Sequence, residues 1–348
     1  MRARVDPSVR HRPKSDLDHN RLEGQTIPSV LRQTQGVKPV FQFAGVIFCL
    51  LCFSTQGGAP NIGLAETYPV VPEPVEPDPI NDPPGTLGFD GLRPPRLRAQ
   101  AAMIYNPVTH EVLWESDGYA RRPIASITKV MTALVFLGEE PDLTRDVVVS
   151  RRDVRRANTT YLRRGERIEL GDLLHLALVA SDNAAARVLA RVSPWGSEGF
   201  VEQMNLKATE LGLRSTSFAD PSGLNKQNLS TPYDLSRLIS HATENSTIVA
   251  IMQKNSYGFR TNRRAVTVRN TNRLLRGRLN VIGGKTGYID ASGYCLAAVV
   301  DDSNIGPLSV VVLGARSNSG RFSEIGRLAD WASENGESLS SPQALKLN

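Results

Sequence analysis

The sequence predicts an α+β domain whose sheet joins parts of the chain that lie far apart in sequence. Two β-prone runs, Ala101–Asn106 and Val112–Ser116, flank a turn-rich segment and are typical of a hairpin. In the C-terminal third, the β-rich runs Tyr294–Asp301 and Leu308–Ala315 bracket a second turn. Between these strands, apolar residues recur at helical spacing. Strands at both ends of a helical middle indicate an α+β arrangement.

The helices follow from start and stop signals and from apolar spacing. Ser126–Leu137 begins after Pro123 and ends at Gly138. One long helix is predicted over Leu170–Ala190, where apolar residues recur every three to four positions. Asp220-Pro221-Ser222-Gly223 is typical of a turn. Three further helices are expected at Gly199–Leu211, Pro232–Thr243 and Ser323–Glu337.

A short apolar run lies in the N-terminal region. Val40–Phe53 spans 14 residues and follows a basic stretch that ends at Lys38. A membrane-spanning helix needs about 20 residues, so the run is better suited to a secretory signal, with a cleavage site after Ala65. An uncleaved membrane anchor and a buried core helix remain as alternatives. Export predicts a location in the periplasm or at the outer face of the cytoplasmic membrane.

Composition divides the chain into four parts. Residues 1–65 form the leader, and residues 66–97 form a tether dense in proline, which cannot supply helix or ladder hydrogen bonds. The folded domain is expected over residues 98–337, followed by a tail at 338–348.

The net charge of +6 does not indicate nucleic acid as a partner. Residues 1–65 hold eight Lys and Arg against four Asp and Glu, which leaves 33 bases and 31 acids in the rest. Cys295 is the one cysteine after the leader, so no internal disulfide is expected there, and we interpret it as a buried core residue.

Ser126-Ile127-Thr128-Lys129 is the first of three motifs that indicate chemistry. On a helix, residues three apart share a face, so the lysine can accept the serine proton if burial lowers its pKa. The free N–H groups of a helix N-terminus would favour the negative charge that develops there. Alone, a Ser-x-x-Lys string is expected about once by chance in a chain of this length.

The other two motifs are Ser181-Asp182-Asn183, after an apolar helical stretch, and Lys285-Thr286-Gly287, after two glycines. By itself the first is better explained as a helix cap. The second would place Lys285 and Gly287 on one face of a strand, with glycines that allow close backbone approach. The alternative for the second motif is a plain turn.

In this order, about 55 and 100 residues apart, the motifs resemble those of penicillin-recognising serine enzymes. The residues that flank the motifs narrow the resemblance to the low-molecular-mass penicillin-binding D-alanyl-D-alanine carboxypeptidase and endopeptidase family. The resemblance covers Arg98 to Trp331. The similar segments within it are Pro123–Ala133, Leu211–Leu213, Phe218, Asp220–Leu224, Gly284–Tyr288 and Ala291–Tyr294. The resemblance implies a β-lactamase/transpeptidase-like fold, in which helices flank an antiparallel sheet from both chain ends beside an all-helical lobe.

The resemblance also implies catalytic roles. Ser126 would be the nucleophile that attacks the penultimate D-Ala carbonyl, and Lys129 its general base. Ser181 would relay the proton to the leaving amine, while Lys285 would assist this relay and keep the pKa of Lys129 depressed.

Five more residues would bind substrate on the same grounds. Asn183 would contact a substrate amide, and Thr286 would bind the terminal carboxylate. The backbone of Gly287 would lie against the substrate, and the N–H of Tyr288 would complete an oxyanion hole with that of Ser126. Arg321 would be a carboxylate-binding arginine, with an ordinary surface arginine as the alternative.

The implied activity is serine-type D-Ala-D-Ala carboxypeptidase action on peptidoglycan stem peptides, inhibited covalently by β-lactams and needing no metal or organic cofactor. The alternative is a D-alanyl endopeptidase that cleaves cross-links. Tyr288 replaces the histidine of many relatives, and the chain ends soon after the last predicted helix, as in the shorter members, some of which are endopeptidases.

Other classes of protein fit the sequence less well. A Ser-His-Asp hydrolase lacks its Gly-x-Ser-x-Gly elbow, and a zinc peptidase lacks its paired-histidine motif. A β-lactamase would need a deacylating glutamate, for which Glu210 is the nearest candidate. A non-catalytic wall-binding module would leave a complete catalytic set idle.

Overall fold

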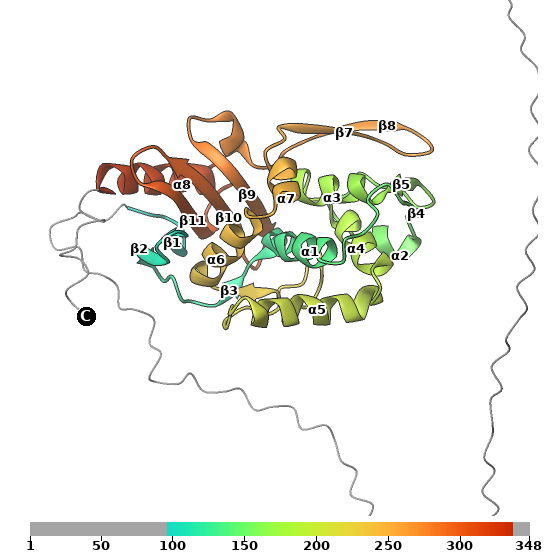
Figure 1. Ribbon diagram of the computed structural model, residues 1–348, viewed down its shortest axis with the longest axis horizontal. Coiled ribbons are helices and arrows are strands. Elements are labelled where there is room, and N and C mark those ends of the chain that lie inside the picture. The colour runs from blue at the N-terminus through green and yellow to red at the C-terminus, as the bar shows by residue number, and fades with distance from the viewer. Residues whose placement is uncertain (1–95, 337–348) are drawn as a thin grey trace, which may run out of the picture. The chain divides into compact units, whose positions relative to one another are not determined.

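The computed structural model describes residues 96–336, and the leader, most of the tether and the tail lie outside them. A five-stranded antiparallel sheet forms one part of the domain (Figure 1), in the order β2-β1-β11-β10-β9. Its strands are β1 (Ala101–Asn106), β2 (Glu111–Ser116), β9 (Asn280–Ile289), β10 (Gly293–Asp302) and β11 (Gly306–Ala315). The predicted union of both ends of the domain in one sheet is confirmed.

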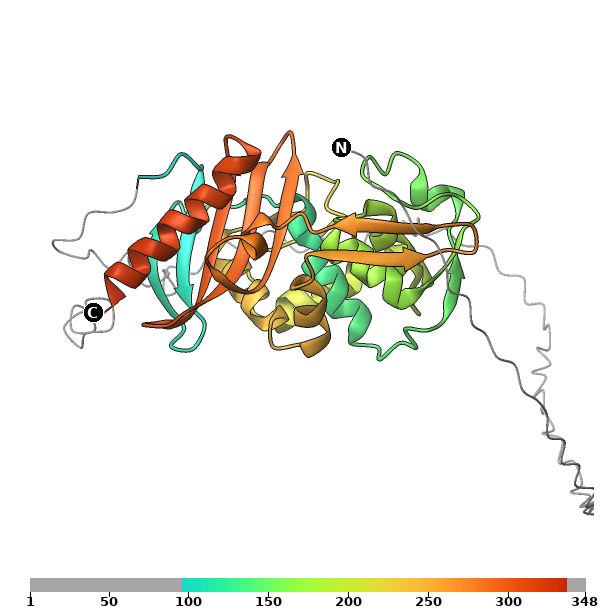
Figure 2. The same ribbon diagram turned by 90° about the horizontal axis from the view of Figure 1, so that it is seen from above.

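The two faces of the sheet are covered by helices from different parts of the chain. α8 (Asn318–Glu334) packs Ile325 and Leu328 against Val310 of β11. α6 (Pro232–Ala242) packs its apolar residues with the neighbouring Val311. Because successive strand residues point to opposite faces, the two helices lie on opposite sides of the sheet, as Figure 2 shows for α8.

A helical lobe stands beside the β9 edge of the sheet (Figure 1). Its central helix is α1 (Thr128–Leu137), whose residues up to Phe136 are buried. Around it lie α2 (Arg151–Val154), α3 (Leu170–Val179), α4 (Asn183–Val192), α5 (Gly196–Glu210) and α7 (Ser246–Met252). The hairpin of β7 (Ser256–Arg260) and β8 (Ala265–Arg269) runs along this lobe (Figure 2). Two short two-stranded pairs complete the domain: β3 (Arg122–Pro123) with β6 (Leu229–Ser230), and β4 (Asp146–Val148) with β5 (Arg167–Glu169).

The single helix predicted over Leu170–Ala190 is wrong. The structure has two helices, α3 and α4, and the chain turns between them at Ser181, whose φ is 59°. Asp182 starts the second helix because its carboxylate accepts the N–H of Ala185 at 2.9 Å. The motif Ser181-Asp182-Asn183 therefore supplies a tight turn as well as a cap.

Three predicted helix starts also shift, and the helix predicted from Gly199 begins at Gly196 as α5. The segment from Ser126 begins as a 3₁₀ turn, η2 (Ala125–Ile127), before α1. The last helix starts at Asn318 instead of Ser323, since the Ser317 hydroxyl accepts the N–H of Gly320 and caps it.

Candidate active site

The Ser126 hydroxyl and the Lys129 amine meet at the start of the helical lobe. Ser126 lies in η2 and Lys129 in the first turn of α1, and the Lys129 Nζ donates to the Ser126 Oγ at 2.9 Å. Ser126 is half-buried, while the lysine side chain has no exposed surface. The 3₁₀ turn therefore leaves Ser126 partly accessible to solvent, while the Lys129 side chain is shielded from it.

Two further acceptors hold Lys129 in place. Its Nζ donates to the Asn183 Oδ1 at 2.6 Å and to the backbone carbonyl of Ser222 at 2.5 Å. Burial is the main cause that lowers the pKa of Lys129 to about 7, while Asp220 and Asp182 act in the opposite direction. At neutral pH much of the amine is therefore unprotonated and able to accept the serine proton.

Ser181 and Lys285 form a second hydroxyl–amine pair. The Lys285 Nζ donates to the Ser181 Oγ and to the Thr286 carbonyl, both at 2.8 Å. The pKa of Lys285 is lowered because of burial and then by the charges of Lys129 and Arg321. Burial and then Arg187 lower the pKa of Lys129. The expectation that Lys285 keeps this pKa depressed stays a prediction, and the repulsion between the two amines, which acts on both, is consistent with it.

Two glycines bring other backbone segments close to the nucleophile. A Cβ at Gly287 would lie 2.8 Å from the Ile124 carbonyl oxygen and 3.1 Å from the Ser126 nitrogen. A Cβ at Gly223 would lie 2.0 Å from the Ala125 carbonyl oxygen, and its φ of +83° is unfavourable to other residues. The absence of side chains at these positions thus lets β9 and the Asp220–Gly223 turn enclose the peptide of Ser126.

The side chains of Asn183 and Thr286 are engaged within the protein. The Asn183 Oδ1 accepts from Lys129, and its Nδ2 donates to the Ala157 carbonyl at 2.7 Å, which leaves one N–H for a substrate. The Thr286 hydroxyl donates to the Thr271 hydroxyl at 2.7 Å and is nearly buried. The Lys285 amine contacts Ser181 and Gly287 lies against the Ser126 peptide, whereas the Thr286 hydroxyl is directed to Thr271.

The side chains of Tyr288 and Arg321 both lie near the ring of Tyr294, next to the end of β9. The Tyr288 ring is 48 % exposed and stacks on Tyr294 with centroids 4.4 Å apart. Arg321 is only 6 % exposed, so the surface-arginine alternative is wrong. Its Nη1 donates to the Gly287 carbonyl at 2.8 Å, and its Nε is buried with no hydrogen-bond partner within the described residues. Arg321 therefore holds the backbone of the Lys-Thr-Gly motif in place through the Gly287 carbonyl.

Sequence reasoning missed several residues that build the site. Asp220 accepts the N–H groups of Ser222 at 2.5 Å and Gly223 at 2.6 Å, which shapes the turn that holds the Ser222 carbonyl against Lys129. The Asp-Pro-Ser-Gly signal was visible as a turn, but nothing in it indicated a partner 93 residues away. Thr271 carried no signal at all.

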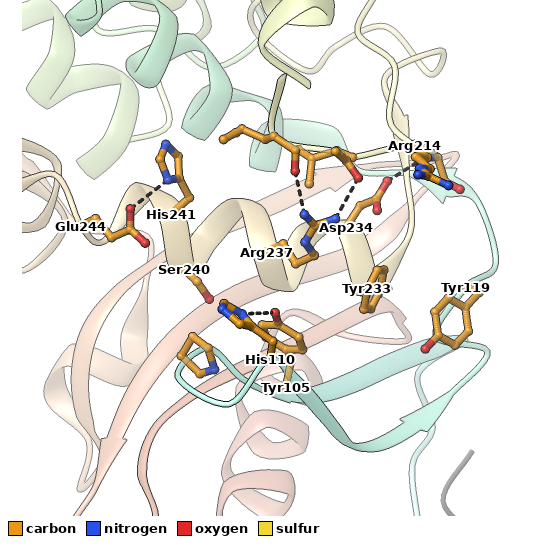
Figure 3. Close-up of a pocket in the computed structure, with 15 residues that line it drawn as sticks. Tyr105, His110, Tyr119, Arg214, Tyr233, Asp234, Arg237, Ser240, His241 and Glu244 are labelled. Atoms are coloured by element: carbon orange, nitrogen blue, oxygen red, sulfur yellow. Dashed lines mark hydrogen bonds and ion pairs between the residues drawn. The ribbon is translucent and has the colours of Figure 1, made fainter. Parts of the chain in front are cut away.

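A separate cavity of about 810 Å³ lies between α6 and the loop that follows α5 (Figure 3). Several of its polar groups are bonded to one another: the Tyr105 hydroxyl lies 3.0 Å from the His110 Nδ1, and Arg237 donates to the carbonyls of Leu211 and Gly212. The Tyr119 hydroxyl, also in the lining, is buried with no hydrogen-bond partner within the described residues. Ser126 and Lys129 are not among its lining residues, and we assign it no chemistry. Over residues 96–336, no cluster of His, Cys, Asp or Glu is suited to a metal ion.

Comparisons with known proteins agree with this geometry. A family model described as D-alanyl-D-alanine carboxypeptidase matches residues 90–317. A D-alanyl-D-alanine endopeptidase of Pseudomonas aeruginosa is 33 % identical over 72 % of this chain and 82 % of its own length. The D-alanyl-D-alanine carboxypeptidase of Streptomyces sp. strain K15 is 31 % identical over 61 % of this chain and 80 % of its own.

Solved structures show the same fold. The Streptomyces K15 DD-transpeptidase superimposes with a TM-score of 0.64 at 29 % identity, covering 69 % of this chain and 98 % of that one. The D-alanyl-D-alanine carboxypeptidase of Mycobacterium tuberculosis H37Rv gives 0.65 at 29 % identity, over 70 % and 94 %. With a fold and two hydroxyl–amine pairs of this kind, the chain belongs to the D-alanyl-D-alanine carboxypeptidase family of serine peptidases.

Proposed function

We propose that this protein hydrolyses the terminal D-Ala–D-Ala bond of peptidoglycan stem peptides through an acyl-enzyme on Ser126. The observation that carries the proposal is the contact of the Ser126 hydroxyl with a buried amine whose pKa is about 7. Such a lysine is a base matched to neutral pH, which general-base catalysis requires.

In the acylation step, the neutral Lys129 amine accepts the Ser126 proton while the Oγ attacks the penultimate D-Ala carbonyl. The backbone N–H groups of Ser126 and Tyr288 are proposed to hold the oxyanion. The close approach of Gly287 to the Ser126 nitrogen supports this arrangement.

The second pair is proposed to serve the leaving group. Ser181 passes a proton to the departing D-Ala amine and regains one from Lys285, which it contacts at 2.8 Å. Lys285 in turn receives the proton that Lys129 took from Ser126, so Lys129 is neutral again before deacylation. The C–N bond breaks, leaving an ester on Ser126. Water then attacks the ester, with Lys129 again as base, and releases the shortened peptide.

Substrate orientation is assigned to residues along β9 and α4. The Lys285 charge would receive the terminal carboxylate together with the Thr286 hydroxyl, which would turn from Thr271 to donate to it. The remaining Nδ2–H of Asn183 would donate to a substrate amide. The buried arginine would act on this carboxylate indirectly, because its Nη1 is bonded to the Gly287 carbonyl. Arg321 is therefore a positioning residue in this proposal.

A second candidate is a D-alanyl endopeptidase acting on cross-links. It is favoured by relatives of 32–34 % identity from Pseudomonas aeruginosa, Escherichia coli and Haemophilus influenzae, all named D-alanyl-D-alanine endopeptidase. Incubation with pentapeptide monomer and with cross-linked dimer separates the two reactions, because free D-Ala is the product of the first and monomer the product of the second. Release of neither product would reject both.

Labelled penicillin tests the acyl-enzyme directly. We expect stable labelling of the wild type and none of Ser126→Ala, since a β-lactam would acylate the same hydroxyl. Rapid turnover of the label would indicate a β-lactamase instead, and an unlabelled wild type would contradict the proposal.

The substrate implies an exported enzyme. The predicted signal or anchor at Val40–Phe53 lies outside the described residues, and no helix within residues 96–336 is both long and apolar enough to cross a membrane. We propose the periplasm or the outer face of the cytoplasmic membrane as its location, which detection in the periplasmic fraction would test.

A further inference from the structure

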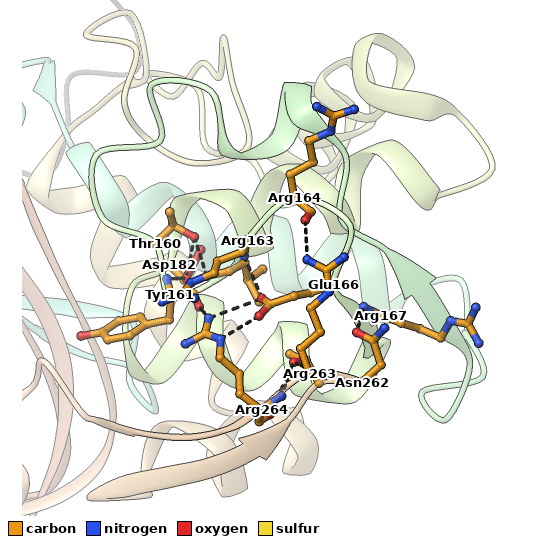
Figure 4. Close-up of polar contacts among 12 residues, drawn as sticks. Thr160, Tyr161, Arg163, Arg164, Glu166, Arg167, Asp182, Asn262, Arg263 and Arg264 are labelled. Carbon is orange, nitrogen blue, oxygen red and sulfur yellow. Dashed lines mark hydrogen bonds and ion pairs between the residues drawn. The ribbon is translucent and has the colours of Figure 1, made fainter.

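An arginine-rich surface lies on the helical lobe, where the tip of the β7–β8 hairpin meets the loop before β5 (Figure 4). Its members, called here the arginine patch, are Arg163, Arg164, Arg167, Arg260, Arg263 and Arg264. Five are exposed and Arg264 is half-buried. In Figure 4 the side chains of Arg164 and Arg167 point away from the protein.

The positive charge of the chain is concentrated around this patch. Residues 151–169 and 256–269 contain 11 arginines and no lysine, against three Asp and Glu, an excess larger than the +6 of the whole chain. Of the three acids, Asp153 and Glu166 are buried and paired with Arg191 and Arg264. Only Glu169 is exposed. The use of arginine alone matters, because its planar fork binds carboxylates and phosphates with two parallel hydrogen bonds.

Polar contacts between the hairpin and the loop hold these like charges side by side. Glu166 has no exposed surface and accepts from the Arg264 Nε at 2.7 Å. The Asn262 N–H donates to the Arg167 carbonyl at 3.2 Å, and the Arg167 N–H donates back to the Asn262 Oδ1 at 2.9 Å. A fixed cluster of like charge repels itself, so an anion that neutralises it would be bound favourably.

The loop that carries the patch is bonded to the catalytic turn. The Tyr161 N–H donates to the Asp182 Oδ2 at 2.5 Å, and the Asn183 N–H donates to the Thr159 carbonyl at 3.0 Å. Asp182 follows Ser181 directly in sequence. Tyr161 is 40 % exposed and in Figure 4 extends in the direction opposite to Arg167. An anionic polymer on the patch would therefore reach the neighbourhood of the catalytic serines.

We propose that the arginine patch binds the free carboxylates of stem peptides in polymeric peptidoglycan, next to the peptide that occupies the catalytic site. This inference rests on the proposed function. Stem peptides carry carboxylates and repeat along a glycan strand, so a polymer can engage the patch and the catalytic site at once. Linked contacts of this kind strengthen binding without any single strong contact, whereas a short soluble peptide gains nothing from them.

The test uses the quadruple variant Arg163→Gln, Arg164→Gln, Arg260→Gln and Arg263→Gln, which keeps Arg264 and its buried partner. Binding is read as the fraction that sediments with purified peptidoglycan sacculi at low and at high salt. We expect about tenfold weaker binding at low salt and a loss of the salt dependence, because exposed ion pairs are individually weak and screened. Turnover of soluble pentapeptide should stay within about twofold of wild type, since the catalytic pairs are untouched.

Two controls sharpen the result. The variant Arg96→Gln, Arg98→Gln and Arg276→Gln removes exposed arginines from outside the patch and should bind sacculi as the wild type does. The corresponding four lysine substitutions in the patch keep the charge and should recover part of the binding.

Unchanged sedimentation of the glutamine variant, or an equal loss in the control, would overturn the proposal. So would a variant that still binds sacculi but no longer binds phosphatidylglycerol vesicles, because the patch would then recognise lipid phosphates. Failure of the proposed function is distinguishable: a wild type that sediments with sacculi but hydrolyses no D-alanyl peptide contradicts the catalytic proposal alone.

Discussion

The Lys129 amine lies 2.9 Å from the Ser126 hydroxyl although the lysine side chain has no contact with solvent. Its charge is balanced by the dipoles of Asn183 and Ser222 and, at longer range, by Asp220 and Asp182. Burial of the base thus sets both the reactivity of the nucleophile and the pH range in which it works.

The rate of penicillin acylation should rise with pH through about 7, the pKa of Lys129, because only the neutral amine accepts the serine proton. The measurement is the second-order labelling rate of the wild type between mildly acidic and mildly alkaline pH. A rate that is flat through this range would mean that Lys129 is not the base.

The same lysine predicts how stability depends on pH. Its folded pKa of about 7 lies below the ordinary 10.5, so between these values the unfolded chain binds more protons than the folded one. Stability should therefore increase from pH 7 toward pH 10.5 on account of this group, and Lys285, whose pKa is also lowered, acts with the same sign. Lys129→Met should reduce this increase in urea unfolding experiments at several pH values.

Ser181→Gly should separate chemistry from backbone strain. The residue has a φ of 59°, which glycine adopts without penalty, so the variant should be as stable as the wild type or up to about 1 kcal/mol more stable. It lacks the hydroxyl that contacts Lys285, so peptide hydrolysis should fall by about 10²- to 10⁴-fold. Thermal unfolding and turnover of pentapeptide, measured on the same preparation, check both halves. Retained turnover would remove Ser181 from the relay.

Much of the fold could be predicted because local signals and tertiary packing agree. The pattern around Ala101–Asn106 gave β1 with its observed bounds, and Pro232 with the polar face that follows gave α6 within one residue. The break at Ser181 was missed because the apolar pattern continues through it, whereas the Asp182 cap and the tertiary bonds to Tyr161 and Thr159 stop the helix. The β7–β8 hairpin was missed because its arginines and glycine give a weak strand pattern, whereas the buried Glu166–Arg264 pair is visible only in three dimensions.

The candidate active site was likewise predicted only in part from the sequence. Motif spacing led to the residues that meet at Ser126 and Ser181, because those side chains carry the chemistry. It could not show that Arg321 is buried and bonded to the Gly287 carbonyl, since that depends on how α8 packs on the sheet. Nor could it identify Thr271 or Ser222, which contribute through a single hydroxyl and a backbone carbonyl.

Gly287→Ala should lower the rate of penicillin acylation much more than it lowers the stability of the domain. The added Cβ would lie 2.8 Å from the Ile124 carbonyl oxygen, so β9 or the Ser126 turn must shift. A displacement on the scale of 1 Å at the nucleophile costs about 100-fold in rate. Gly326→Ala is the matched control, because nothing lies within 4 Å of a Cβ at that helical position, and it should label normally and be slightly more stable.

Glu166→Gln should destabilise the helical lobe by about 2 kcal/mol, because it removes the charge from a carboxylate with no exposed surface while Arg264 remains beside it. Burial opposes ionisation of Glu166, but hydrogen bonds from Arg264 and from the Arg163 N–H more than offset this and lower its pKa below the ordinary 4.5. The pair therefore stabilises the fold above that pH, and the stability is lost as the pH falls through the folded pKa. Urea unfolding at neutral and at acidic pH should show that the free energies of unfolding of the wild type and of Glu166→Gln become similar in acid.

Glu210→Gln is the control, since its pair with Lys207 lies on the surface and should contribute less than about 0.5 kcal/mol. An equal effect of both substitutions would mean that the Glu166–Arg264 pair does not hold the hairpin to the loop.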